Sequence, residues 1–303
     1  MPIPSLQIPT QLVAEQALSR LQSLRQLGRL ELSMMVVLSA LAGYLFAGGR
    51  WQIEVLLVAA GVGLLSTGCS ALNQWQEQDL DIRMKRTQQR PLPAGKLSSS
   101  TVVLLASLSL SCGLLLLAAL PGNRPLLLGI LAIIWYNAIY TPLKRITPFA
   151  AFPGAICGAL PPLIGWSAAG GALISEKSLI LAGTLFVWQI PHTWLLLCRY
   201  REDLQRSGLP NIFKTMSTQR LLKINNCWLA SLCLCYLLFP LFDFIKSQTL
   251  VYLFISGLLI IIFAIIRKPA DMQKPESILQ TFHLTNISMA LLLTILILDR
   301  LFI

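Results

Sequence analysis

The chain has 303 residues, of which 55% are hydrophobic and only 12% are charged, and its mean hydropathy is +0.68. This composition excludes an ordinary soluble domain and predicts an all-α, polytopic membrane protein. The formal net charge of +11 does not indicate a nucleic-acid partner. In a membrane protein, cytoplasmic loops rich in Lys and Arg explain a positive charge more simply.

The N-terminal region does not resemble a secretory signal peptide, because it has no apolar core followed by a small-residue cleavage site. Within it, residues 12–27 have helical apolar spacing with arginines on the polar side. We expect residues 1–30 to form a cytoplasmic amphipathic segment on the membrane surface. A mitochondrial presequence is the alternative interpretation. Residues 31–303 are expected to form one transmembrane domain.

Apolar runs that can cross a hydrocarbon core of roughly 30 Å predict nine transmembrane helices. The runs lie near residues 31–48, 53–72, 98–120, 125–141, 149–171, 179–198, 226–245, 249–266 and 284–303. The fifth contains several Pro and Gly residues, so we expect a broken helix that lines a cavity. If the N-terminus is cytoplasmic, most of the 24 Lys and Arg residues fall on the cytoplasmic side, as the positive-inside rule requires.

The most polar stretch of the chain follows the second run, at residues 73–95. Asn73, Glu77 and Asp81 are spaced four residues apart, so a continuous helix would place them along one face. Their oxygen atoms are ligands of the kind that Mg²⁺ prefers. Asp79 would point away from this face, toward solvent or a salt bridge.

Two groups of cations lie close to this stretch and suit a diphosphate. Lys85, Arg86 and Arg90 follow the acids directly, and Lys144 and Arg145 come after Tyr140 at the end of the fourth run. Positive-inside anchoring is the alternative explanation for each of these residues.

A third cluster begins with His192, which lies inside the sixth run. An ionisable residue within a membrane span is costly and therefore suggests a function. We considered a haem contact or axial ligand, a proton relay and a hydrogen-bonded packing residue. Asp203 follows 11 residues later, and we expect it three turns farther along the same helix, where it could complete a metal site with the first motif.

Four sequence blocks together resemble the UbiA-type intramembrane prenyltransferases, and more narrowly the branch of that family that farnesylates protohaem IX. The blocks are NQWQEQDLDIRMKRTQQRPLPAG (73–95), YTPLKRITP (140–148), GALPPLIGW (158–166) and WQIPH (188–192), the last followed by Asp203 and Gly-Leu-Pro. They occur in the order of the family, which makes the match more specific than any single block.

The resemblance implies nine helices around a cytoplasm-facing cavity in a bacterial inner membrane. It implies farnesyl diphosphate as donor, haem B as acceptor, Mg²⁺ as cofactor, and haem O as a product destined for a terminal oxidase. Haem A synthase or the terminal-oxidase assembly would be the protein partners.

The resemblance also assigns roles to individual residues. Tyr140 would belong to the active site, and His192 would lie on the haem side of the cavity. The Mg²⁺–diphosphate ligands would be Asn73, Glu77, Asp81 and Asp203. The diphosphate contacts would be Lys85, Arg86, Arg90, Lys144 and Arg145.

Two positions depart from the family pattern. The middle acid of the first motif is usually Asp, whereas Glu77 carries its carboxylate about one bond farther out. Ala150 stands where an Asn is common. Two other functions stay open: prenylation of an aromatic acid or a quinone precursor, and a non-catalytic role in haem handling or transport.

Overall fold

The computed structural model describes residues 20–266 and 274–301, and these ranges contain helices and turns but no strand. The all-α prediction is therefore confirmed for the described residues. The helices are α2 (Leu30–Phe46), α3 (Ile53–Gln76), α4 (Gln78–Asp81), α5 (Ser99–Ala118), α6 (Arg124–Ile133), the π-helix η1 (Ile134–Tyr140), α7 (Thr141–Leu143), α8 (Ala151–Ala168), α9 (Glu176–Arg199), α10 (Arg201–Ser207), α11 (Ile212–Thr215), α12 (Thr218–Leu241), α13 (Gln248–Ile266) and α14 (Pro275–Leu301). Of the N-terminal segment predicted at 1–30, residues 1–19 lie outside the described part.

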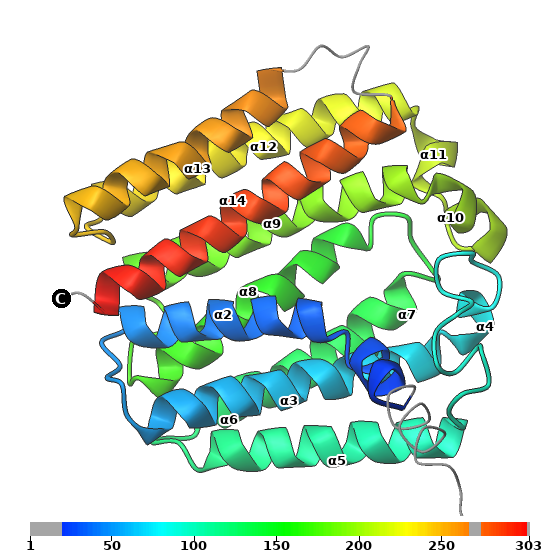
Figure 1. Cartoon of the computed structure of the whole chain (residues 1–303), viewed down its shortest axis with the longest axis horizontal. Helices are drawn as coiled ribbons and strands as arrows, with labels where there is room; N and C mark the ends of the chain where they lie inside the picture. Colours follow the sequence, from blue (N-terminus) through cyan, green and yellow to red (C-terminus); the bar gives the residue numbers. More distant parts are fainter. Residues whose placement is uncertain (1–19, 267–273, 302–303) are drawn as a thin grey trace, which may run out of the picture.

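The long helices form one bundle made of two groups (Figure 1). In the first group α3 packs against α2 and α5, and α6 packs against α8. In the second group α9 and α14 pack together, with α12 and α13 on their outer side. Contacts between α8 and α9, and between α2 and α14, join the two groups.

Seven helices of the described chain are long and apolar enough to cross a membrane, and a bent pair, Arg20–Leu27 with α2, makes an eighth candidate. The two parts of the bent pair meet at 49°. Many large apolar side chains on the outside of the bundle are exposed, including Leu115, Leu234 and Phe263. Such a surface is stable against lipid, so the chain is a multi-pass membrane protein.

The expected break in the fifth apolar run was wrong, because α8 is continuous through Pro161 and Pro162. Pro153 falls in the first turn of α8, where a missing backbone donor costs little. The last span also begins earlier than expected, so that His283 lies within α14 and not before it. Hydropathy detects the apolar centre of a helix, whereas the helix itself extends into polar residues at its ends.

The helices α2 and α8 approach each other closely at two glycines. A side chain at Gly43 would meet the carbonyl of Pro162, and one at Gly165 would meet the carbonyl of Ala40. The two backbones therefore touch without intervening side chains, which is how small residues stabilise helix pairs in membranes.

The short polar elements gather at one end of the bundle. In Figure 1, α4, α7, α10 and α11 all lie at the same end. The turns that the sequence placed on the cytoplasmic side are thus brought together, although they are far apart in the chain.

Substituting Gly165→Ala should lower the free energy of unfolding by about 1–3 kcal/mol, because the added methyl group must push two backbones apart. The measurement is thermal unfolding of the purified protein in detergent. Gly183→Ala in α9 is the matched control. It has open space at the Cβ position, and the same change in a helix interior should be neutral or stabilise by up to about 1 kcal/mol. Equal effects in the two variants would contradict the close approach.

Candidate functional site

The acidic motif lies where α3 ends, and its backbone is not one continuous helix as the spacing predicted. Glu77 has φ −108° and ψ 12°, which separates α3 from α4. The motif residues Asn73, Glu77 and Asp81 nevertheless expose only 0%, 7% and 1% of their surface. Three oxygen-bearing side chains are therefore buried at the polar end of an apolar bundle.

Each buried carboxylate of this motif is paired with a cation. Lys144 Nζ lies 2.5 Å from Glu77 Oε1. Arg90 Nη1 donates to both oxygens of Asp81, at 2.8 and 2.7 Å. A buried charge without a partner is strongly destabilising, so these ion pairs are what allows the acids to stay inside.

Arg29 is a member of the site that the sequence analysis did not single out. It lies at the start of α2 in the left-handed region, with φ 46° and ψ 57°. Its Nη2 donates to Asn73 Oδ1 at 3.2 Å, while Asn73 Nδ2 donates to Thr141 Oγ1 at 3.1 Å. A non-glycine residue in this conformation is costly and is retained where the surroundings demand it. In the sequence Arg29 looked like any cationic residue at a membrane entry.

Asp203 was expected on the same helix as His192, and this prediction was wrong. Helix α9, which carries His192, ends at Arg199, and Asp203 lies on α10. Its two carboxylate oxygens accept hydrogen bonds from the backbone N–H groups of Lys85 and Arg86, at 3.0 and 3.1 Å. Asp203 is therefore buried against the stretch that follows the first motif. It fixes the backbone that carries two of the predicted diphosphate-binding residues.

The side chains of these two cations are accessible to solvent. Lys85 and Arg86 are exposed, and the guanidinium of Arg86 lies 4.8 Å from the centre of the Tyr200 ring. They are therefore available to an anionic ligand at the end of the bundle.

Arg145 has a different environment from its neighbour Lys144. It donates to both oxygens of Asp79, at 2.9 and 2.7 Å, and both side chains are largely exposed. The salt-bridge interpretation of Asp79 is confirmed. The hydrogen bond from Arg145 lowers the pKa of Asp79 below its ordinary value.

Tyr140 ends the π-helical segment η1, a type of turn that is frequent at functional sites. Lys144 Nζ lies 4.9 Å from the centre of its ring. A side chain at Gly154 of α8 would collide with this ring. The glycine thus leaves room for Tyr140 beside the Glu77–Lys144 pair.

The imidazole of His192 contacts two aromatic rings, with ring centroids 4.8 Å from that of Trp188 and 4.9 Å from that of Phe282. Its Nδ1 is 2.8 Å from Asn286 Oδ1. Because that oxygen accepts, Nδ1 carries the hydrogen and Nε2 keeps a lone pair. Such an imidazole can accept a hydrogen bond or bind a metal atom through Nε2.

Two opposing effects set the pKa of Glu77. Burial raises it, but the charge and hydrogen bond of Lys144, together with the charge of Arg29, outweigh burial and hold it below its ordinary value. Glu77 is therefore ionised at neutral pH.

The chemistry of the donor set fits Mg²⁺, since the buried side chains of Asn73, Glu77, Asp81 and Asp203 all offer oxygen. No group of three or more His, Cys, Asp or Glu residues in the described ranges forms a ready metal cluster. The carboxylates instead contact protein cations or backbone N–H groups.

The comparisons with known proteins agree with this architecture. A model described as the UbiA prenyltransferase family matches residues 36–290. The chain belongs to the UbiA prenyltransferase family, a class of enzymes built within the membrane. This confirms the resemblance seen in the four sequence blocks.

The curated relatives point to one branch of the family. A protein of Oleidesulfovibrio alaskensis named Protoheme IX farnesyltransferase is 36% identical over 281 residues, which cover 93% of this chain and 97% of that protein. One of Geobacter sulfurreducens with the same name is 46% identical over 182 residues, covering 60% of this chain and 67% of that protein.

Solved structures show the same fold at low sequence identity. A UbiA homologue from Aeropyrum pernix superposes with a TM-score of 0.75 at 19% identity, covering 89% of this chain and 98% of that chain. A homologue from Archaeoglobus fulgidus bound to DMAPP and Mg²⁺ gives a TM-score of 0.62 at 18% identity, covering 90% and 99%.

Replacing Lys144 with Met should destabilise the protein by about 3 kcal/mol, because the buried Glu77 carboxylate loses its partner. The matched control is Arg145→Met, which breaks an exposed pair and should cost less than about 1 kcal/mol. Adding Glu77→Gln to Lys144→Met should restore part of the loss. The measurement is thermal unfolding in detergent, and similar losses in the two single variants would be inconsistent with the burial of the Glu77–Lys144 pair.

The stability loss in Lys144→Met should also depend on pH. Without Lys144, burial raises the pKa of Glu77 in the folded state above that in the unfolded state. Folding then favours the protonated form, so the variant's penalty is small at low pH and grows as pH rises through the folded pKa. Unfolding curves from pH 5 to pH 8 should show a widening gap from the unsubstituted protein. A gap that narrows with rising pH would refute this account.

Proposed function

We propose that this chain transfers a farnesyl group from farnesyl diphosphate to a vinyl group of haem B, giving haem O. The observation that carries the proposal is the 36% identity to a curated protoheme IX farnesyltransferase over nearly the whole of both chains. The buried acids and cations at one end of the bundle supply the polar site that a diphosphate substrate requires.

The diphosphate binds at this polar end. Exposed Lys85 and Arg86, with Arg90, Lys144 and Arg145 nearby, supply the positive charge that stabilises a departing diphosphate. Arg29 adds a further cation beside Asn73. These residues orient the donor and neutralise it, and preorganised charges of this kind account for much of enzymatic rate enhancement.

Mg²⁺, held by Asn73, Glu77, Asp81 and Asp203, would neutralise part of the diphosphate charge and help that group to leave. The solved homologue bound to DMAPP and Mg²⁺ supports this cofactor at the level of the family. Glu77 occupies the position at which the family usually has Asp. It lies at the break between α3 and α4 and reaches Lys144.

The reaction breaks the bond between C1 of the farnesyl group and the diphosphate oxygen, and the electron pair leaves with diphosphate. The π electrons of a haem vinyl group form the new carbon–carbon bond. Water then adds to the resulting cation and loses a proton, which gives the hydroxyl group of the product. The apolar bundle keeps water from the allylic cation before that bond forms.

The acceptor side of the site includes His192. Its Nε2 lone pair, set by the hydrogen bond from Nδ1 to Asn286, suits either the haem iron or a hydrogen bond to an acceptor. Trp188 and Phe282, which contact the imidazole, provide flat apolar surface for a porphyrin. Tyr140 lies at the donor end beside Lys144.

We propose nine spans among the described residues, made up of the seven candidate helices, the bent pair and α8. These spans form one transmembrane domain with Arg20–Leu27 at its cytoplasmic edge, and the site opens to the cytoplasm of a bacterial inner membrane. The excess of Lys and Arg at the polar end supports this orientation. Haem O would pass to haem A synthase or to the terminal-oxidase assembly.

One assay tests the proposal directly. Purified protein in detergent receives haem B, farnesyl diphosphate and Mg²⁺, and the pigments are separated by chromatography with mass detection. A haem that carries a hydroxyfarnesyl addition, and that does not form when a chelator is present, is the expected product. Unchanged haem, with a prenylated aromatic acid or quinone precursor in a parallel acceptor screen, would reassign the substrate. The absence of turnover with every acceptor would favour haem handling or transport.

Two neighbouring acids in α4 provide a matched pair of variants. Asp81→Asn should reduce turnover by at least about a hundredfold, because a buried charge at the diphosphate end is lost. Asp79→Asn should keep most of the activity, since Asp79 is exposed and pairs with Arg145. Circular dichroism would establish that both variants fold. Activity of Asp81→Asn close to that of the unsubstituted protein would overturn the assignment of the site.

A further inference from the structure

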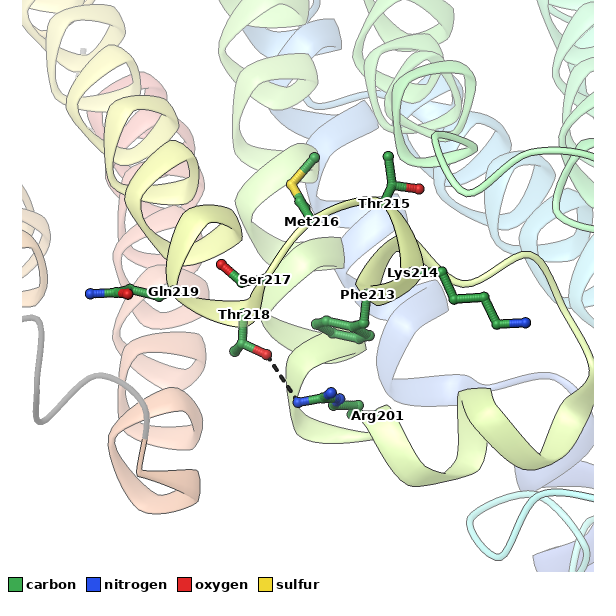
Figure 2. A pocket seen from close by; sticks show the side chains of 8 residues that line it. All are labelled: Arg201, Phe213, Lys214, Thr215, Met216, Ser217, Thr218 and Gln219. Carbon is green, nitrogen blue, oxygen red and sulfur yellow. Dashed lines mark hydrogen bonds between the residues drawn. The ribbon is translucent and has the colours of Figure 1, made fainter.

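A polar cavity of about 630 Å³ lies outside the charged cluster described above (Figure 2). It is bounded by α10, α11 and the start of α12. The residues that line it are Arg201, Phe213, Lys214, Thr215, Met216, Ser217, Thr218 and Gln219. Two cations, several hydroxyl groups and two apolar side chains therefore share one hollow.

Arg201 is held in position without a charged partner. Its Nη1 donates to Thr218 Oγ1 at 3.2 Å, and its guanidinium lies 5.0 Å from the centre of the Phe213 ring. No carboxylate pairs with Arg201 or Lys214 in the part of the chain that the structure describes. Stacking on an aromatic ring orients an arginine while leaving donors for an anion.

The cavity is distinct from the diphosphate end. Arg201 and Asp203 both lie on α10, but two residues apart on a helix point in nearly opposite directions. Asp203 contacts the backbone of Lys85, whereas Arg201 faces α12 through Thr218. The predicted diphosphate contacts thus lie on one side of α10 and this cavity on the other.

The position of the cavity suits a lipid. It lies at the polar end of the bundle beside the start of α12, a peripheral helix. Farther along α12, Leu234 and Leu237 expose 66% and 49% of their surface, so this helix faces the hydrocarbon. A cavity at its polar end therefore lies at the depth of the headgroups, and Phe213 and Met216 give it an apolar wall.

We propose that this cavity binds the phosphate headgroup of an anionic phospholipid from the surrounding bilayer, with Arg201 and Lys214 as its charged contacts. Basic pockets at the cytoplasmic ends of membrane helices recognise such headgroups. The positive end of the α12 dipole adds to the attraction. A bound lipid would brace α10, which carries Asp203, from the side opposite to the diphosphate site.

The test uses the full chain in nanodiscs that contain phosphatidylcholine with a small fraction of phosphatidylglycerol. Native mass spectrometry counts the lipids that stay bound after release from the disc. The double variant Arg201→Gln/Lys214→Gln removes both charges of the cavity. Arg206→Gln is the matched control, because Arg206 lies on the same helix, is exposed and pairs with Glu202 at 3.5 Å.

The unsubstituted protein and Arg206→Gln should retain phosphatidylglycerol in preference to phosphatidylcholine. The double variant should retain it roughly twentyfold less, as expected for the loss of two cations near the headgroup. Equal retention by the double variant would overturn the proposal, and so would an equal loss in Arg206→Gln, which would indicate general surface charge.

A competition arm separates a lipid from a free phosphate. Inorganic phosphate at millimolar concentration should leave the bound phosphatidylglycerol in place. Displacement of the lipid by inorganic phosphate alone would show a site for a soluble anion and would overturn the proposal. Thermal unfolding of each variant would show that the double variant is folded, so that loss of lipid reports on the cavity.

Discussion

The charged end of this bundle is governed by the cost of burying carboxylates in an apolar protein. Glu77 and Asp81 can be buried because they form ion pairs with Lys144 and Arg90, respectively. Asp203 can be buried because its carboxylate accepts hydrogen bonds from backbone N–H groups. Each contact joins segments that are remote in sequence or fixes a turn. The contacts that fold this end of the protein thus also gather the charges that a diphosphate needs.

This arrangement gives the site two sets of groups that complement one substrate. The carboxylates suit a divalent cation, and their partners suit the phosphates. The two sets also neutralise one another, so that the buried carboxylates of Glu77 and Asp81 have charged partners. Arg29 fits the same logic, because its strained backbone places another cation beside the amide of Asn73.

The sequence predicts the class of fold well, because the class depends on local composition. Apolar runs identify the helices, and the rare charges beside them identify Lys144 and Asp81. The sequence is poorer at backbone detail. The i, i+4, i+8 spacing gave no sign of the break at Glu77, and a distance of 11 residues did not reveal that Asp203 lies on a separate helix.

Long-range partners were harder still to predict. Arg29 contacts a residue 44 positions away, and a cation near a membrane entry is too common for its position to signal that role. The continuity of α8 through two prolines was also unexpected, because a proline by itself weakens a helix. Packing against neighbouring helices decides whether the helix continues. Such features depend on tertiary contacts that no local pattern contains.

The glycine contact between α2 and α8 has a consequence for how bulky substrates could reach the interior. Where two backbones touch directly, no side chain can change rotamer to open a passage. A passage for a porphyrin or a long isoprenoid is therefore not expected between these two helices. The α2–α8 pair has little room to adjust, so any adjustment to a bulky substrate has to come from helix pairs that have side chains between them.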